Sequence, residues 1–330
     1  MTCSRMRLAS RRRALTALLA ASLCSSALWA QGFPAKPIKL IVPFPPGGGT
    51  DIIAREVANK VATQQGWTLV IDNKPGSGGN LGVDAAAKAA PDGYTLVLGQ
   101  TSNLAINATL YPRLPYNPLK DLAAIAPVAT APLVLVVAAD SPYKTVADVV
   151  AAAKARPEAL NYASSGSGTV AHLAAEQFQK VASVRFTHVP YKGAAQGVTD
   201  LIGGQIQMYI SSVPTLIGHI RNGKMRALAV TSLKRTDDLP NVPTLAESGY
   251  KDFEAVTWFG VVGPAALPKE AIAKLNAAFN KAIEAPDVQK KLAAQGADVL
   301  GGSPDKLAAL ISSETARWAP LVKASGAKVD

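Results

Sequence analysis

The chain has 330 residues, 48% of them hydrophobic, and a formal net charge of +11. Its basic residues are scattered, without the long runs and interleaved aromatics of a nucleic-acid-binding face, so we expect no nucleic-acid partner. Beyond the short apolar stretch near the N-terminus, no further apolar run has the roughly 18 residues of a membrane-spanning helix.

The first thirty residues have the three parts of a secretory signal peptide. Five arginines and no acidic residue lie within 1–13, and an apolar run follows from Ala14 to Ala30. This run is shorter than the roughly 20 residues that span a bilayer, which disfavours a membrane anchor. We expect export to the periplasm with cleavage near Ala30, with Ala27 as the alternative site. The arginines leave both general secretion and twin-arginine export open.

Both cysteines, Cys3 and Cys24, fall in this segment. The mature chain is therefore expected to have no disulfide, no thiolate nucleophile and no cysteine metal site. Removal of the five arginines leaves 29 basic and 23 acidic residues, and this excess favours mild steering of anionic ligands. The remaining length exceeds the comfortable size of one hydrophobic core and predicts two lobes.

Strands and helices alternate along most of the chain. Predicted strands cover 38–42, 68–72, 94–98, 133–138, 160–163, 185–189 and 206–210, and predicted helices cover 51–62, a segment ending at 90, 145–154, 172–181 and 194–202. Such alternation predicts βαβ units and parallel sheets. The last third is predicted to be helical, because Ile272, Leu275, Phe279 and Ile283 form one apolar stripe.

Two stretches punctuated by proline or glycine, 127–132 and 232–258, are the expected crossings between lobes. We predict one lobe from residues 31–130 plus 250–330 and a second from 131–249. A chain that leaves the first lobe, builds the second and returns makes a hinge of two crossings, which closes around ligand as in periplasmic binding proteins.

Three loops share one design: each follows a predicted strand, is rich in glycine or hydroxyl residues, and opens a helix. They cover 43–51, 164–169 and 189–194. Glycine allows close backbone approach, and the unpaired N–H groups and dipole of a helix start favour a negative charge. Such a site holds an anion without a cationic side chain. Any one of these loops could be simple capping, as we interpret Thr50 and Asp51, but three together favour binding.

Catalytic and phosphate motifs are incomplete. Neither the Walker pattern nor the dinucleotide glycine pattern is present, and no G-x-S-x-G elbow occurs. His172 lies close in sequence to the loop 164–169, which we call the serine loop. A hydrolase that uses Ser165 or Ser167 with His172 is therefore an alternative, although no orienting acid is evident. We predict no catalytic residue, no metal and no cofactor.

A series of motifs, in order along the chain, resembles a known family. They are PIKLIVPF at 37–44 with GGGTD at 47–51, NKPGSGG at 73–79, PDGYTL at 91–96, YASSGSGT at 162–169 with His172-Leu173, HVPYKG at 188–193 and DLIGGQ at 200–205. This series is similar to the Bug family, the periplasmic receptors of tripartite tricarboxylate transporters. The resemblance implies an α/β, two-lobed, type II-like Venus-flytrap fold that binds small carboxylates through backbone groups, hydroxyls and waters.

Carried over to this chain, the resemblance implies ligand-binding residues in both lobes. They are Phe44, Gly48, Gly49, Thr101, Ser102, Asn103, Ser164, Ser165, Gly166, Gly168, Thr169, Tyr191 and Gly193. Where the family often has an acidic residue after the 203–205 segment, this chain has Tyr209-Ile210-Ser211-Ser212. This departure argues against a ligand recognised through an amine and adds Ser212 as a neutral contact.

We therefore expect a monomeric solute-binding protein for a mono- or dicarboxylate, aromatic ones included, with integral membrane transporter subunits as partners. A periplasmic sensor that presents its closed form to a signalling partner is an alternative, as is the serine hydrolase.

Overall fold

The computed structural model describes residues 32–327 and 329. The chain divides into a unit that ends at Pro37 and a second that begins at Ile38. The described residues of the first unit, 32–37, have no regular secondary structure. Every element below belongs to the second unit. The expected signal peptide lies outside the described residues.

The first sheet begins with three parallel strands. β1 (Ile38–Val42) is an apolar, largely buried run that pairs with β2 (Leu69–Asn73) on one side and β3 (Thr95–Gln100) on the other. Helix α2 (Gly49–Gln65) follows β1, and α3 (Asn80–Ala87) follows a 3-10 turn at Ser77–Gly79. After β3 come a π-helical turn, Ser102–Ile106, and the short α4 (Asn107–Leu110).

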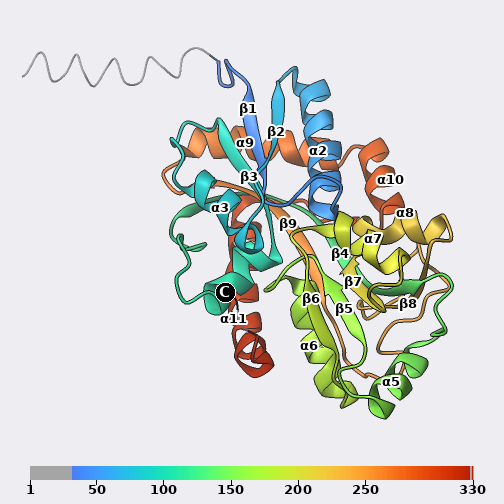
Figure 1. Cartoon of the computed structure of the whole chain (residues 1–330). Helices are drawn as coiled ribbons and strands as arrows, with labels where there is room; N and C mark the ends of the chain where they lie inside the picture. Colours follow the sequence, from blue (N-terminus) through green and yellow to red (C-terminus); the bar gives the residue numbers. More distant parts are fainter. Residues whose placement is uncertain (1–31, 328, 330) are drawn as a thin grey trace, which may run out of the picture. The chain divides into compact units, whose positions relative to one another are not determined.

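Two antiparallel strands connect this sheet to a second one (Figure 1). β9 (Val256–Pro264) pairs with β3 and with the first part of β4 (Leu122–Ala138). The last part of β4, from Leu133, pairs instead with β7 (Met208–Ser212) and β8 (Met225–Val230). The expected βαβ units and parallel pairing are present in the outer strands of both sheets, whereas β4, β8 and β9 run antiparallel to their neighbours, which the sequence did not predict.

The stretch 127–132, expected as an irregular crossing, is part of β4. A strand can contain Pro127 because the register of β4 on β9 shifts beside it, and such irregularities tolerate a missing N–H. The lobe boundaries themselves remain a prediction.

The second sheet continues from β7 to β5 (Asn161–Ser164) and β6 (Thr187–Pro190), all parallel. Its helices are α5 (Val146–Ala155), α6 (Val170–Ala182), α7 (Ala194–Ile202) and α8 (Val213–Arg221). The sequence analysis predicted these strands and α5 to α7 within a few residues, and it missed α8 and β8.

The C-terminal part is mainly helical, as predicted. It contains α9 (Lys269–Ile283), α10 (Pro286–Ala294), the short β10 (Asp298–Val299) and α11 (Pro304–Ser325). Leu275, Phe279 and Ile283 of the predicted stripe are buried. Among the described residues, no helix combines the length and apolar character needed to cross a membrane.

Candidate ligand-binding site

Four helices begin around one cavity. β1, β5, β6 and β7 each lead, at their carboxyl ends, into α2, α6, α7 and α8. The cavity between these helix starts has a volume of about 50 Å³. We call it the inner cavity; it is lined by Phe44, Pro45, Gly48, Gly49, Thr50, Gln100, Leu133, Ser165, Thr169, Val170, Ala171, Gly193, Ala194, Ser211, Ser212, Thr215 and Thr257.

The N-cap residues of all four helices line the inner cavity: Gly48, Thr169, Gly193 and Ser212. None of the described residues that line it carries a charged side chain. The positive ends of four helix dipoles, first-turn N–H groups that have no acceptor within their own helix backbone, and several hydroxyls therefore set the electrostatics of this space. Such a set of neutral donors suits an anion with hydrogen-bond-accepting oxygens.

The starts of α2 and α8 touch directly. The N–H of Gly49 donates to Oγ1 of Thr215 over 3.0 Å, and this oxygen lies 2.9 Å from Oγ of Ser212. A Cβ on Gly49 would lie only 2.7 Å from the Ser212 hydroxyl oxygen, so the approach depends on glycine. Gly193 is equally close to the first loop, since its Cβ would lie 2.6 Å from Cγ of Pro45.

Asp51 does not line the cavity, and it does more than cap a helix. Its carboxylate accepts hydrogen bonds from the Gly47 N–H, from Arg55 and from Asn73, at 2.9–3.0 Å. Burial alone would raise the pKa of Asp51, but these hydrogen bonds and the Arg55 charge lower it below its usual value. These three donors occupy the Asp51 carboxylate and hold the first loop in place. The carboxylate therefore repels an anion in the cavity less than the sequence suggests.

A second and larger cavity adjoins the first. We call it the outer cavity; it has a volume of about 640 Å³ and shares Phe44, Pro45 and Ser165 with the inner one. Its remaining lining residues are Pro75, Gly76, Ser77, Gly78, Gly79, Tyr111, Gly166, Ser167, Pro190, Tyr191, Lys192 and Val329.

The structure brings half of the residues proposed from sequence to the inner cavity: Phe44, Gly48, Gly49, Ser165, Thr169, Gly193 and Ser212. Gly166 and Tyr191 line the outer cavity. The others line neither cavity: Thr101, Ser102, Asn103, Ser164 and Gly168.

Physical reasons account for most of these exceptions. Oγ1 of Thr101 accepts from the Trp258 N–H at 2.9 Å, and Oδ1 of Asn103 accepts from the Gln100 N–H at 3.0 Å. Both side chains are fully buried and support the turn after β3. Gly168 packs where a Cβ would lie 2.4 Å from Leu110, so it allows close packing.

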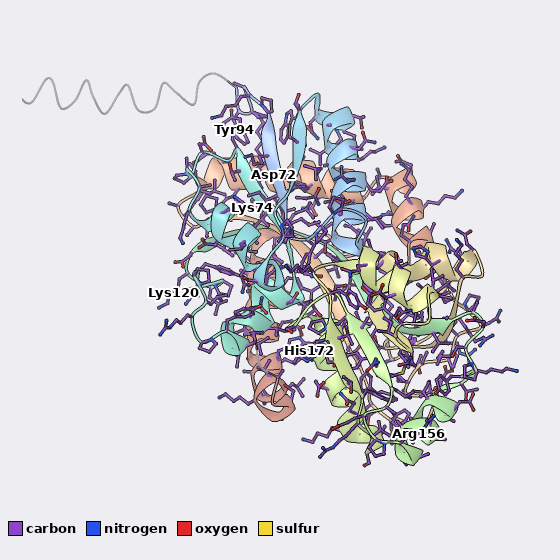
Figure 2. The ribbon with its side chains drawn as sticks, in the orientation of Figure 1. Asp72, Lys74, Tyr94, Lys120, Arg156 and His172 are labelled. Atoms are coloured by element: carbon purple, nitrogen blue, oxygen red, sulfur yellow. The ribbon has the colours of Figure 1, made fainter. Side chains whose placement is uncertain are left out.

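Two stacked histidines hold the serine loop in place through hydrogen bonds. His172, labelled in Figure 2, belongs to the first turn of α6, and its Nδ1 accepts from the Gly168 N–H at 3.1 Å. Nε2 of His188 lies 2.7 Å from Oγ of Ser164, and the two rings stack with centroids 4.1 Å apart. Tyr162 stacks on His188 with a centroid distance of 4.8 Å.

Burial lowers the pKa of His172 to about 4. Burial and the neighbouring His172 lower the pKa of His188 to about 3. Both rings are therefore neutral at physiological pH. Because Nδ1 of His172 accepts from Gly168, the proton sits on Nε2, which leaves no free base facing Ser165 or Ser167. This arrangement positions a loop and does not activate a nucleophile.

Sequence reasoning missed four polar residues of the inner cavity: Gln100, Ser211, Thr215 and Thr257. Oγ1 of Thr257 donates to Oε1 of Gln100 at 3.2 Å, across the pairing of β3 with β9. Polar residues at strand ends are common, so they predict no site by themselves. Only the antiparallel pairing of β9 with β3 shows that Thr257 and Gln100 meet. The prediction that Thr50 caps a helix was wrong, since the N-cap of α2 is Gly48 without a side-chain cap, and Thr50 lines the inner cavity.

Comparison with known proteins shows the family. Residues 53–327 match the family model of the tripartite tricarboxylate transporter family receptor. Protein BugT of Bordetella pertussis is 40% identical over 301 residues, which cover 91% of this chain and 92% of that protein. The described fold is also similar to two solved structures from Rhodopseudomonas palustris. One, with adipate, has a TM-score of 0.87 and 34% identity over 90% of this chain and 100% of that one. The other, MatC with bound malate, has a TM-score of 0.83 and 31% identity over 88% and 100%.

These likenesses confirm the predicted two-lobed α/β fold of periplasmic binding proteins. They also exclude the hydrolase alternative, because the family consists of receptors and not of enzymes. The chain belongs to the tripartite tricarboxylate transporter receptor family, among the Bug proteins, and is a periplasmic solute-binding protein.

Proposed function

We propose that this protein captures a small mono- or dicarboxylate in the inner cavity and delivers it to the membrane subunits of a tripartite tricarboxylate-type transporter. The observation that carries the proposal is the meeting of four helix N-termini around a cavity whose described lining has no charged side chain. A carboxylate offers two oxygens that accept from neutral N–H and O–H donors, and its charge favours the positive ends of the helices.

Two further considerations support the carboxylate. The solved neighbours of this fold were described with adipate and with malate, both carboxylates. Within the described part of the chain no acidic side chain lines the inner cavity, so nothing there would recognise an amine. The residues lining it, Ser212 included, are the proposed contacts, together with Gly166 and Tyr191 at its outer side.

A thermal-shift screen tests the proposal. The mature chain is heated with a series of carboxylates, aromatic ones included, and with the matching uncharged amides. A ligand present at about 100 times its Kd stabilises the folded chain by about 2.7 kcal/mol, which raises Tm by several degrees. Carboxylates should produce this rise and amides should not. Equal shifts for both series, or none for any carboxylate, would refute the ligand class.

Delivery to a transporter is a separate part of the proposal. It is supported by the family, whose members are transporter receptors. Deleting the gene should abolish uptake of the labelled ligand by cells, and restoring it should recover uptake. Normal uptake with loss of a ligand-induced transcriptional response would instead favour the sensor alternative.

The expected processing and lobes complete the proposal. Export with cleavage near Ala30 is tested by N-terminal sequencing of the protein from the periplasm. A monomer built of lobes 31–130 plus 250–330 and 131–249 should shrink in radius of gyration when a ligand binds, as measured by small-angle scattering. An unchanged radius with saturating ligand would contradict the two-crossing hinge.

A further inference from the structure

A hydroxyl in the inner cavity helps to bind an anion only if its proton points at the ligand. A serine hydroxyl has one proton and two lone pairs, so it can face a ligand as donor or as acceptor. Ser165 of the serine loop lines the inner cavity, and its Oγ lies 3.1 Å from the phenol oxygen of Tyr209. Either oxygen can donate to the other, and the direction decides what Ser165 offers to a ligand.

Tyr209 belongs to β7, is fully buried and lines neither the inner nor the outer cavity. Its ring packs in a core cluster that also contains Val198 of α7 and Val213 of α8. Gly197 allows α7 to pack closely on this ring, because a Cβ there would lie 3.3 Å from the Cε1 and Cζ atoms. A ring packed in this way keeps one position, so the phenol oxygen stays fixed beside Ser165.

The surroundings of the phenol favour donation from Tyr209 to Ser165. Burial raises the pKa of Tyr209 to about 12, despite its hydrogen bonds with Ser165 and Ser211, so the phenol keeps its proton at physiological pH. A phenol, with an ordinary pKa of about 10, is more acidic than an aliphatic hydroxyl and is therefore the stronger donor. When the phenol proton is used on Oγ of Ser165, the proton of Ser165 itself is free to point into the cavity.

An anion in the inner cavity favours the same direction. A chain of hydroxyls beside a negative charge is most stable when every proton points toward that charge, because each hydrogen bond then strengthens the next. Ser211 then donates to Tyr209, Tyr209 donates to Ser165, and Ser165 donates to the ligand. Tyr209 thus stands in the middle of this chain without touching the ligand.

We propose that Tyr209 is a positioning residue for ligand recognition, which donates to Ser165 and thereby directs the Ser165 hydroxyl at the carboxylate in the inner cavity. This inference rests on the proposed function, because it fixes the direction of one donor of that site. The cavity then presents a donor at Ser165 before the ligand arrives. Such preorganisation strengthens binding, since the ligand does not have to reorient the hydroxyl.

A double-mutant cycle followed by isothermal titration of the mature chain tests this. The probe is adipate or, where adipate gives no thermal shift, the carboxylate with the largest shift in the screen above. Tyr209→Phe keeps the ring and removes the hydroxyl, and we expect about five-fold weaker binding, as for one neutral hydrogen bond. Ser165→Ala should weaken binding at least about ten-fold, because it removes a donor to a charged group. In the Ser165→Ala chain, Tyr209→Phe should have less than about a two-fold further effect, because the hydroxyl that it orients is gone.

The matched control is Tyr116→Phe, which removes another buried phenol hydroxyl. Tyr116 lines neither cavity, and its hydroxyl donates to the Asn103 carbonyl at 2.6 Å. This variant should change the affinity for the probe less than about two-fold. Ser211→Ala is a second background for the cycle, in which Tyr209→Phe should still weaken binding about five-fold.

The outcomes separate this inference from the proposed function. A Tyr209→Phe effect that is absent, or equal with and without the Ser165 hydroxyl, would overturn the inference. So would unchanged affinity in Ser165→Ala, a measurement that does not depend on the folding of a Tyr209 variant, or a Tyr209→Phe effect that disappears in the Ser211→Ala chain instead. In each of these cases the unmodified chain still binds a carboxylate, and the proposed function stands. If no carboxylate bound the unmodified chain, the proposed function would fail, and this inference with it.

Discussion

The histidine stack under the serine loop makes stability depend on pH in a calculable way. An unfolded histidine has a pKa near 6.5, whereas burial lowers that of His172 to about 4. Between these values the unfolded chain binds more protons than the folded chain, so stability falls as the pH falls. The contribution is complete above pH 6.5 and is lost by about pH 4. For His172, which is 5% exposed, the loss at pH 4 is about 3 kcal/mol.

The perturbation that isolates this effect is the double substitution His172→Asn/His188→Gln. An asparagine oxygen can still accept from the Gly168 N–H, and a glutamine amide can still reach Ser164, but neither side chain titrates. Urea unfolding followed by circular dichroism at pH 7, 5.5 and 4 gives the free energy of unfolding for both proteins. Carboxylates titrate alike in both, so their contribution cancels. Between pH 7 and pH 4 the unmodified chain should lose at least about 3 kcal/mol more stability than the doubly substituted chain loses, and parallel curves would refute the reasoning.

Three further predictions concern the loops around the inner cavity. Gly193→Ala places a Cβ 2.6 Å from Cγ of Pro45, and we expect at least about a ten-fold loss of carboxylate affinity by titration calorimetry with an unchanged circular dichroism spectrum; unaltered affinity would show that the loops do not need this approach. Thr215→Val removes the acceptor of the Gly49 N–H and should lower ligand affinity by about 1–3 kcal/mol, whereas Thr199→Val on the exposed side of α7 should have no such effect. Asp51→Ala leaves the Gly47 N–H, Arg55 and Asn73 without their shared partner, and chemical unfolding should show a loss of about 3 kcal/mol; a loss below about 0.5 kcal/mol would contradict the role of this carboxylate.

Local patterns in the sequence predicted those parts of the fold that depend on neighbouring residues. The strand 38–42 is a β-branched run ended by prolines, and the helix at 194–202 is bounded by glycines, so both appear as expected. The full length of β4 was not predictable in this way. β4 includes Pro127 and Pro132, which disfavour a strand by local propensity, because its pairing with β9 stabilises the extended backbone there.

The residues of the candidate site likewise include some that local sequence predicts and others that depend on contacts between distant residues. Glycine and hydroxyl residues between a strand and a helix announce the starts of α2, α6 and α7, and only the family resemblance pointed to Ser212. Thr215 gave no signal, because its importance comes from the Gly49 N–H, which lies far away in sequence. Conversely, the family resemblance implied Thr101 and Asn103 as cleft residues, yet backbone N–H groups occupy their side-chain oxygens.

The placement of the four helix starts also bears on how a ligand and the two sheets are coupled. α2 follows a strand of the first sheet, whereas α6, α7 and α8 follow strands of the second. An anion in the inner cavity is therefore attracted by helix ends from both sheets at once. Without the anion, these positive ends face one another with no counter-charge, which opposes their approach. Because no lysine or arginine among the described residues lines the cavity, the anionic ligand of the proposed function would itself supply the counter-charge that these helix ends lack, and this coupling suits a receptor that must both capture and release its cargo.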